Sequence, residues 1–281
     1  MHVIILGSEK KSVGIAKSCL SIADSILIYD KDQPSLNNVR LELDEQIGKD
    51  HHLIEKLEYC SDLKMNYSGK SIVFDCISDQ EKDITYLKQL FSELSLKASI
   101  LFTTSQCYSV TYLASLTADP KRVVGLQFLT DFEGLKMVEL IKGIHTAQTV
   151  LENAQHLLEQ MGKNAIIVKD SPGFLLNRLV LVLINEAIYL LNEGIGTPKE
   201  IDSEMELSIG MKIGPLRLAD TIGLDRILKM LNHLYEGTGN PKFLPCPLLQ
   251  NMVDAGYLGV ETNNGFFNYS ADILNFPHLK S

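Results

Sequence analysis

Cysteine is scarce in this chain, and its spacing builds no covalent or metal framework. Five cysteines occur among 281 residues, an odd number at wide intervals with no Cys-x-x-Cys pair. This pattern argues against a disulfide scaffold and offers no zinc ligand set. We therefore expect buried, reduced thiols, a cytoplasmic location and no bound metal.

Positive charge is also in deficit. The chain has 26 Lys and Arg against 35 Asp and Glu, which gives a formal net charge of −9. Such a surface repels polyanions, so neither a nucleic acid nor an anionic membrane is an expected partner. Residues 2–6 are already β-rich, without the basic segment and apolar core of a signal peptide.

A long uninterrupted apolar run is missing as well. The most apolar stretch, Phe174–Leu191, contains Asn177, Arg178, Asn185 and Glu186. Lipid-spanning helices rarely carry so many polar side chains. The stretch instead predicts a helix that is buried among other helices or in a subunit interface.

The first half of the chain alternates between β-rich runs and helix-compatible stretches. Apolar strands that alternate with helices predict a parallel sheet covered on both faces, which is a doubly wound α/β fold of the Rossmann type. The expected strands are His2–Leu6, Ser25–Tyr29, Ser71–Ile77, Ser99–Thr103, Val123–Phe128 and Ala165–Val168. The expected helices are Ser12–Ala23, Ile84–Leu96, Val110–Leu116 and Thr146–Met161.

Helical periods dominate from Ser171 onward. The turn residues Asp170-Ser171-Pro172-Gly173 predict the boundary. We expect a nucleotide-binding domain over residues 1–170 and an all-α domain over residues 171–281. Its expected helices are Phe174–Asn192, Pro198–Ser208, Leu216–Leu234 and Leu248–Ala255.

The polar segment Gln33–Leu57 has two interpretations. Beyond Pro34 it is compatible with a helix. It can be a solvated crossover helix or an arm that projects from the sheet to bind a ligand.

The turn after the first strand has the outline of a dinucleotide-binding loop. Such a loop uses one glycine for the tight turn, a second for approach of the pyrophosphate and a third for close helix packing. In this chain Gly7 fills the first position, Glu9 the second and Ser12 the third. Ser12 adds little bulk, but Glu9 adds a side chain and a negative charge where phosphates approach.

Charged neighbours bear on whether this loop binds a cofactor. Lys10 and Lys11 can offset Glu9 by folding over the phosphates, or they can be exposed loop charges. Asp30 ends the second strand, where an acidic side chain hydrogen-bonds an adenine ribose and favours NAD over NADP. The candidate cofactor-binding residues are Gly7, Ser12, Asp30 and Asp79.

Several motifs resemble those of the NAD-dependent L-3-hydroxyacyl-CoA dehydrogenases, which include 3-hydroxybutyryl-CoA dehydrogenases. The resemblance spans nearly the whole chain in order and spacing. It is carried by residues 169–178 (KDSPGFLLNR), 185–187 (NEA), 201–202 (ID), 214–220 (GPLRLAD), 222–225 (IGLD) and 264–269 (NGFFNY). It implies oxidation of a 3-hydroxyacyl-CoA to the 3-oxoacyl-CoA in fatty-acid metabolism, with NAD as hydride acceptor.

The resemblance also implies four catalytic positions. The family's glutamate corresponds to Glu139 and its asparagine to Asn177, and both are retained. The histidine position carries Gln127, and the serine position carries Gln106. A carboxamide forms hydrogen bonds but cannot take up and return a proton near neutral pH. General acid-base catalysis contributes about 10²–10⁴-fold, so we expect weak or absent activity.

Replacement groups for the missing base are few. Thr130 and Asp131 stand where the family has asparagine and proline after the histidine. Asp131 and Glu133 can act as the base only by swinging inward, and otherwise they are loop residues on the cleft rim. Cys107 follows Gln106, but no histidine in the motif can activate it, so a buried thiol is the expected role.

Four functions remain open. The first is an impaired or repurposed homologue, a pseudoenzyme that still binds an acyl-CoA or a nucleotide and pairs with an active relative. The second is a genuine dehydrogenase with unusual catalytic residues. The third is an oxidoreductase that acts on another hydroxylated substrate, and the fourth is a structural protein. The family's CoA-binding arm is short here, with Lys49 and Lys56 as its available cations, and its helical half implies a homodimer.

Overall fold

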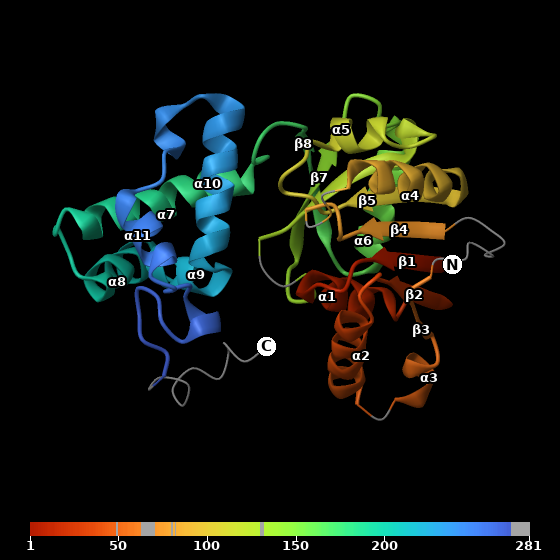
Figure 1. Ribbon diagram of the computed structural model, residues 1–281, viewed down its shortest axis with the longest axis horizontal. Coiled ribbons are helices and arrows are strands. Elements are labelled where there is room, and N and C mark those ends of the chain that lie inside the picture. Colours follow the sequence, from red (N-terminus) through yellow and green to blue (C-terminus); the bar gives the residue numbers. More distant parts are fainter. Residues whose placement is uncertain (49, 63–70, 80, 82, 130–131, 271–281) are drawn as a thin grey trace. The chain divides into compact units, whose positions relative to one another are not determined.

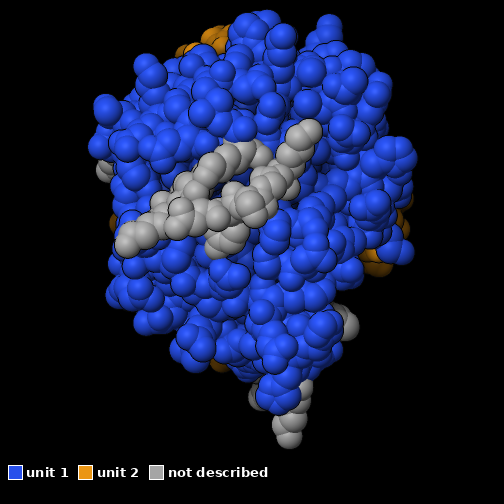
Figure 2. Space-filling view, turned by 90° about the vertical axis from the view of Figure 1, so that its right-hand side faces the viewer, with its two compact units in different colours: residues 1–174 blue, residues 175–281 orange. Residues whose placement is uncertain are grey.

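The chain folds into two compact units, Met1–Phe174 and Leu175–Ser281, which are coloured separately in Figure 2. The computed structural model describes residues 1–48, 50–62, 71–79, 81, 83–129 and 132–270. Each unit is described by itself below.

Unit 1 is built around an eight-stranded sheet with the strand order β3-β2-β1-β4-β5-β6-β7-β8 (Figure 1). Only β6 and β7 pair in antiparallel fashion among the described pairs. The predicted doubly wound α/β fold is therefore confirmed. The strands are β1 (His2–Leu6), β2 (Ser25–Tyr29), β3 (Leu57–Cys60), β4 (Ser71–Asp75), β5 (Ala98–Thr103), β6 (Val123–Gln127), β7 (Met137–Lys142) and β8 (Asn164–Lys169).

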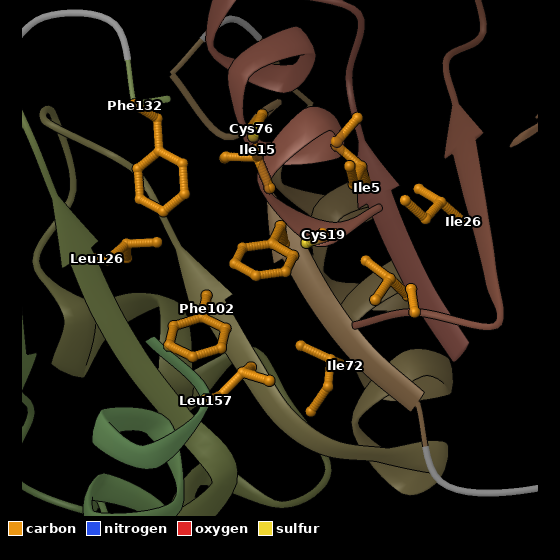
Figure 3. Close-up of a cluster of buried hydrophobic side chains, with 14 of the residues drawn as sticks. Ile5, Ile15, Cys19, Ile26, Ile72, Cys76, Phe102, Leu126, Phe132 and Leu157 are labelled. Carbon is orange, nitrogen blue, oxygen red and sulfur yellow. The ribbon is translucent and has the colours of Figure 1, made fainter. Parts of the chain in front are cut away.

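Side-chain alternation along the strands creates two separate cores, one on each face of the sheet. Val3 and Ile5 of β1 point into a cluster with Ile15 and Leu157, part of which Figure 3 shows. Ile4 and Leu6 belong to the other cluster, which also contains side chains from helices α4 and α5. The helices of unit 1 are α1 (Lys10–Cys19), α2 (Gln33–Ile47), α3 (His51–Ile54), α4 (Ile84–Lys97), α5 (Val110–Ser115) and α6 (Gln148–Gln160), with a 3₁₀ turn at Pro120–Arg122.

Strands β3 and β7 are not predicted by the sequence pattern. The connection between β6 and β7, residues 128–136, is too short for a crossover helix, which takes about a dozen residues or more. The chain therefore returns antiparallel to β6. This return places Glu139 in a strand beside Gln127.

The segment after β2 is a crossover to β3 with α2 as its main element. Leu36, Val39 and Leu43 of α2 are buried in the same core as α1. These contacts favour the crossover interpretation over a projecting arm. Lys56 donates from Nζ to the carbonyl oxygen of Leu20 at 2.8 Å, and Lys49 lies outside the described residues.

Unit 2 is helical throughout its described elements. The predicted single helix Leu216–Leu234 is wrong, because Gly223 adopts a φ of +104° and separates two helices. That backbone conformation is open to glycine at little cost. The helices are α7 (Leu176–Asn192), α8 (Pro198–Ile209), α9 (Pro215–Ile222), α10 (Leu224–Thr238) and α11 (Pro247–Asp254), with 3₁₀ turns at Pro241–Phe243 and Val260–Thr262.

Helix α7 contains most of the apolar stretch singled out from the sequence. Asn185 is buried in it and bridges to another segment, donating to the Leu244 carbonyl oxygen and accepting from the Cys246 N–H. Within the described residues, no helix is both long and apolar enough to span a membrane.

Candidate active site

The first turn keeps the backbone geometry of a nucleotide-binding loop at Gly7. Gly7 has a φ of +96°, and its N–H donates to the Tyr29 carbonyl oxygen at 2.7 Å. A Cβ at this position would lie 3.1 Å from the Cys76 carbonyl oxygen. Both the conformation and the close approach therefore require glycine.

Glu9 occupies the position just before α1 and is neutralised within the loop. Its Oε2 lies 3.1 Å from Nζ of Lys11, and the two side chains are only 23% and 18% exposed. Burial alone would lower the pKa of Lys11, but Cys76, Glu9 and Asp79 together raise it above its usual value. Lys11 is thus a largely buried cation held by Glu9. Lys10 is exposed, which agrees with the interpretation of an exposed loop charge.

Asp30 lies beside this turn, as its position at the end of β2 predicts. Its Oδ2 accepts hydrogen bonds from the Ser8 N–H at 2.8 Å and from the Ser8 hydroxyl at 2.5 Å. Its Oδ1 accepts from the Asp32 N–H at 3.0 Å. Asp30 therefore stabilises the turn itself, and Ser12 is fully buried under it.

The residues of this turn fit NAD only in part. Gly7 and Asp30 hold the positions and the geometry that a dinucleotide loop uses. Glu9 does not fit, because its half-buried carboxylate stands where a diphosphate approaches and already takes up the charge of Lys11. Within this turn, Glu9 is therefore the residue that departs from the pattern of an NAD-binding loop.

Asp79 follows β4 and holds the next loop along the sheet edge. Its carboxylate accepts from the Ser105 hydroxyl at 2.5 Å, the Gln106 N–H at 2.9 Å and the Cys107 N–H at 3.1 Å. Asp79 was expected among the cofactor-binding residues, and here it shapes the loop that carries Gln106. The side chain of Cys107 is half-buried on the same loop.

Asp75, at the end of β4, forms hydrogen bonds with residues that follow β4 and with the end of β5. The buried carboxylate accepts from the Ile77 and Ser78 N–H groups and from the hydroxyls of Ser78 and Thr103. Burial raises the pKa of Asp75. The sequence shows only a polar residue at the end of an apolar run, and nothing in that pattern indicates this role.

Gln127 and Glu139 face each other across β6 and β7. They are direct partners in the antiparallel register, and they are 2% and 3% exposed. Side chains of directly opposed residues lie on the same face of a sheet. The Gln127 amide donates from Nε2 to the Phe128 carbonyl oxygen at 3.2 Å. The two positions that the family resemblance pairs are thus brought together, with a carboxamide in place of an imidazole.

The loop between these strands is tied down from two sides. Lys163 is buried, and its Nζ donates to the carbonyl oxygens of Phe132, Glu133 and Leu135. Glu133 forms an ion pair with Lys17 of α1 at 2.5 Å, so it is held away from the role of a replacement base. Thr130 and Asp131 lie outside the described residues.

Asn177 belongs to unit 2, at the start of α7. It is 3% exposed, and Nδ2 points at the sulfur of Met230, 3.9 Å away. Its Oδ1 has no hydrogen-bond partner among the described residues. An unsatisfied buried amide oxygen is costly and is typical of a functional position.

The site lies at the carboxyl edge of the sheet in unit 1. Gly7 follows β1, Asp30 follows β2, Asp79 follows β4 and Gln106 follows β5, and β5 pairs in parallel with β6, which ends at Gln127. Ligands of doubly wound folds bind along this edge. No group of three or more potential metal ligands occurs within the described part of the chain.

Comparisons with known proteins match both units to one family. The description "3-hydroxyacyl-CoA dehydrogenase, NAD binding domain" matches residues 2–171, and "3-hydroxyacyl-CoA dehydrogenase, C-terminal domain" matches residues 173–269. Together these matches cover nearly all of the chain.

Individual relatives agree with this assignment. A "Probable 3-hydroxybutyryl-CoA dehydrogenase" of Bacillus subtilis is 31% identical over 95% of this chain and 97% of its own length. A "3-hydroxybutyryl-CoA dehydrogenase" of Bradyrhizobium diazoefficiens is 36% identical over 76% of this chain and 71% of its own. The solved (S)-3-hydroxybutyryl-CoA dehydrogenase of Ralstonia eutropha is 31% identical with a TM-score of 0.81, over 96% of this chain and 99% of that one. The chain belongs to the 3-hydroxyacyl-CoA dehydrogenase family.

Proposed function

We propose that this member of the family is an impaired dehydrogenase that keeps the fold and part of the site but little of the chemistry. The family's reaction is NAD-linked oxidation of a 3-hydroxyacyl-CoA, and the relatives named above give 3-hydroxybutyryl-CoA as the substrate to test. The observation that carries the proposal is Gln127, buried opposite Glu139.

The missing step is the removal of the proton from the substrate hydroxyl group. Oxidation of a hydroxyl group requires a base that accepts the hydroxyl proton, and imidazole does so near neutral pH. The Gln127 amide donates or accepts a hydrogen bond but keeps its protons. Glu139, which in this arrangement would stabilise an imidazolium, faces a neutral amide.

Gln106 is a second departure from the family's catalytic residues, in addition to Gln127. Gln106 stands at the position of the oxygen-binding serine, and its backbone N–H is committed to Asp79. A longer side chain on a loop held by three hydrogen bonds changes the shape of the site where the substrate oxygen would lie. The proposed loss therefore concerns both proton transfer and substrate placement.

The experiment is NADH oxidation with acetoacetyl-CoA, measured from pH 5 to 9. The wild-type chain is compared with a repaired variant, E9G/Q106S/Q127H, which restores the three family residues. We expect the wild type to be at least about a hundredfold slower, the lower part of the range for general acid-base catalysis. Equal rates would contradict the proposal and favour a dehydrogenase with unusual catalytic residues.

A regulatory role is the second candidate, and it requires a surface that binds a protein partner. Unit 2 exposes large apolar side chains, with Leu179 at 64%, Leu207 at 85% and Ile209 at 67%. Apolar side chains in such number suit a subunit interface. We propose a homodimer in the cytoplasm, or a mixed dimer with an active relative, and retained binding of an acyl-CoA through the surroundings of Asn177.

Acyl-CoA binding separates the two candidates from a purely structural protein. Calorimetric titration with acetoacetyl-CoA is expected to give saturable binding in the wild type, and the N177A variant is expected to bind at least about tenfold more weakly, since it loses a buried polar partner. Absence of binding by the wild type would favour the structural role.

A further inference from the structure

Glu9 and Lys11 form an ion pair that takes no part in the proton transfer discussed above. Glu9 immediately precedes α1 in an extended conformation, and its side chain makes no capping hydrogen bond to the helix. The helix start uses the Glu9 carbonyl oxygen instead, which accepts from the Ser12 N–H at 2.8 Å. The carboxylate is therefore free to pair with Lys11.

Lys11 lies at the start of α1, near residues that follow the carboxyl end of β4. Its side chain is 18% exposed, and the neighbours that act on its charge include Glu9, Cys76 and Asp79. These groups keep the pKa of Lys11 raised even though burial opposes the charge. The turn thus contains one buried cation, which is already matched by a carboxylate of the same turn.

A diphosphate at this position would need two things. It would need room beside the backbone at the start of α1, where N–H groups point outward, and a positive or neutral local field. Glu9 fills the approach and is negative, and Asp30 lies beside the same turn. Two like charges at contact distance repel strongly in a partly buried site.

We propose that Glu9 and Lys11 decide which ligand this turn accepts: Glu9 takes the place of the diphosphate as the partner of Lys11 and excludes it, and Lys11 becomes the cation for a diphosphate once Glu9 is removed. This inference rests on the turn being the nucleotide site of the proposed function. The wild-type turn then accepts a nucleoside without phosphates better than a dinucleotide.

The test is ligand binding by the full-length protein, without any turnover. NADH is titrated by its fluorescence, and ADP and adenosine are titrated by calorimetry, into wild type, E9G and E9G/K11M. Glycine is well tolerated at a helix N-cap, so E9G is expected to fold. The matched control is D119N, which removes the charge of Asp119 from its ion pair with Arg122. Both side chains of this pair are 33% exposed, and the pair lies just before the first residue of β6, away from the carboxyl ends of the strands.

The expected results form a pattern. E9G binds NADH and ADP at least about tenfold more tightly than the wild type, which is about 1.4 kcal/mol. E9G/K11M loses most of that gain, whereas adenosine binding changes little across the set. D119N binds all three probes as the wild type does.

Three outcomes would overturn the inference. Wild-type binding of NADH as tight as that of E9G would show that Glu9 excludes nothing. Absence of NADH binding in E9G would show that the obstruction lies elsewhere, and an unchanged affinity in E9G/K11M would remove the role of Lys11. A failure of the proposed function appears instead in the acetoacetyl-CoA assay, as wild-type turnover equal to that of the repaired variant.

Discussion

Gln127 and Glu139 are direct cross-strand partners on β6 and β7, and both are almost fully buried. Gln127 carries a neutral carboxamide, so position 127 offers hydrogen bonds to its neighbours but no charge. The family resemblance pairs these two positions, and Gln127 brings no group that titrates near neutral pH. The consequences of this relationship can be measured.

Restoring the imidazole alone should give only partial activity. Q127H is expected to turn over acetoacetyl-CoA with NADH, yet to stay at least about tenfold below E9G/Q106S/Q127H, since two further positions still obstruct. Its rate of 3-hydroxybutyryl-CoA oxidation should rise with pH around 6.5, where imidazole loses its proton. Full activity from Q127H alone would contradict our account of Glu9 and Gln106.

Lys163 should be needed for the stability of the loop after Gln127. K163M removes the donor to three carbonyl oxygens while keeping most of the side-chain volume. We expect it to lower the free energy of unfolding in urea by about 2–3 kcal/mol, because buried acceptors lose their partner. The control K142M removes an exposed lysine of β7 and should change stability by less than about 0.5 kcal/mol. Equal stability of K163M and the wild type would disprove the role.

Asp220 should make the stability of unit 2 depend on pH. Its buried carboxylate accepts from the Phe266 and Phe267 N–H groups and from the Tyr269 hydroxyl, so it holds the last described segment on α9. Burial raises the pKa of Asp220 above the ordinary value of an aspartate. D220N should destabilise by about 1–3 kcal/mol at pH 7, since the amide nitrogen cannot accept from an N–H.

The sign of the pH effect follows from linkage. With a raised pKa in the folded state, Asp220 binds its proton more tightly in that state than in the unfolded chain. The stabilisation that results from this tighter proton binding is complete at pH values below 3.8, the pKa of Asp220 in the unfolded chain. It is lost as the pH rises through the pKa of the folded state. The stability difference between wild type and D220N should therefore widen as pH falls from 7 to 4 in urea unfolding. A difference that stays constant or narrows would refute the raised pKa.

Exposed leucines of unit 2 should control association. Leu207 of α8 is 85% exposed, and L207E would place a charge in the proposed interface. We expect sedimentation to show a dimer for the wild type and a shift of the dissociation constant by at least about tenfold for L207E. L41E is the control, because Leu41 is similarly exposed (68%) but belongs to α2 of unit 1. A monomeric wild type would rule out the dimer.

Local sequence determined much of the architecture and the identity of the candidate site. Alternating apolar strands and helices predicted the doubly wound sheet, and strands β1 and β2 begin and end where the pattern places them. The loop pattern after the first strand singles out Gly7, and the family resemblance singles out Gln106 and Gln127. These features depend on residues that are close in sequence, where periodicity and turn chemistry act directly.

Tertiary structure decided what those residues contact. The return of β7 against β6 places Glu139 opposite Gln127, and Asp79 reaches the Gln106 loop across 27 positions of sequence. Glu9 and Lys11 are near neighbours in sequence, yet their pairing depends on burial against Cys76 and Asp79 from a different strand end. Such contacts are set by long-range packing and by the loss of water around charges, and a local pattern of residues encodes neither of them.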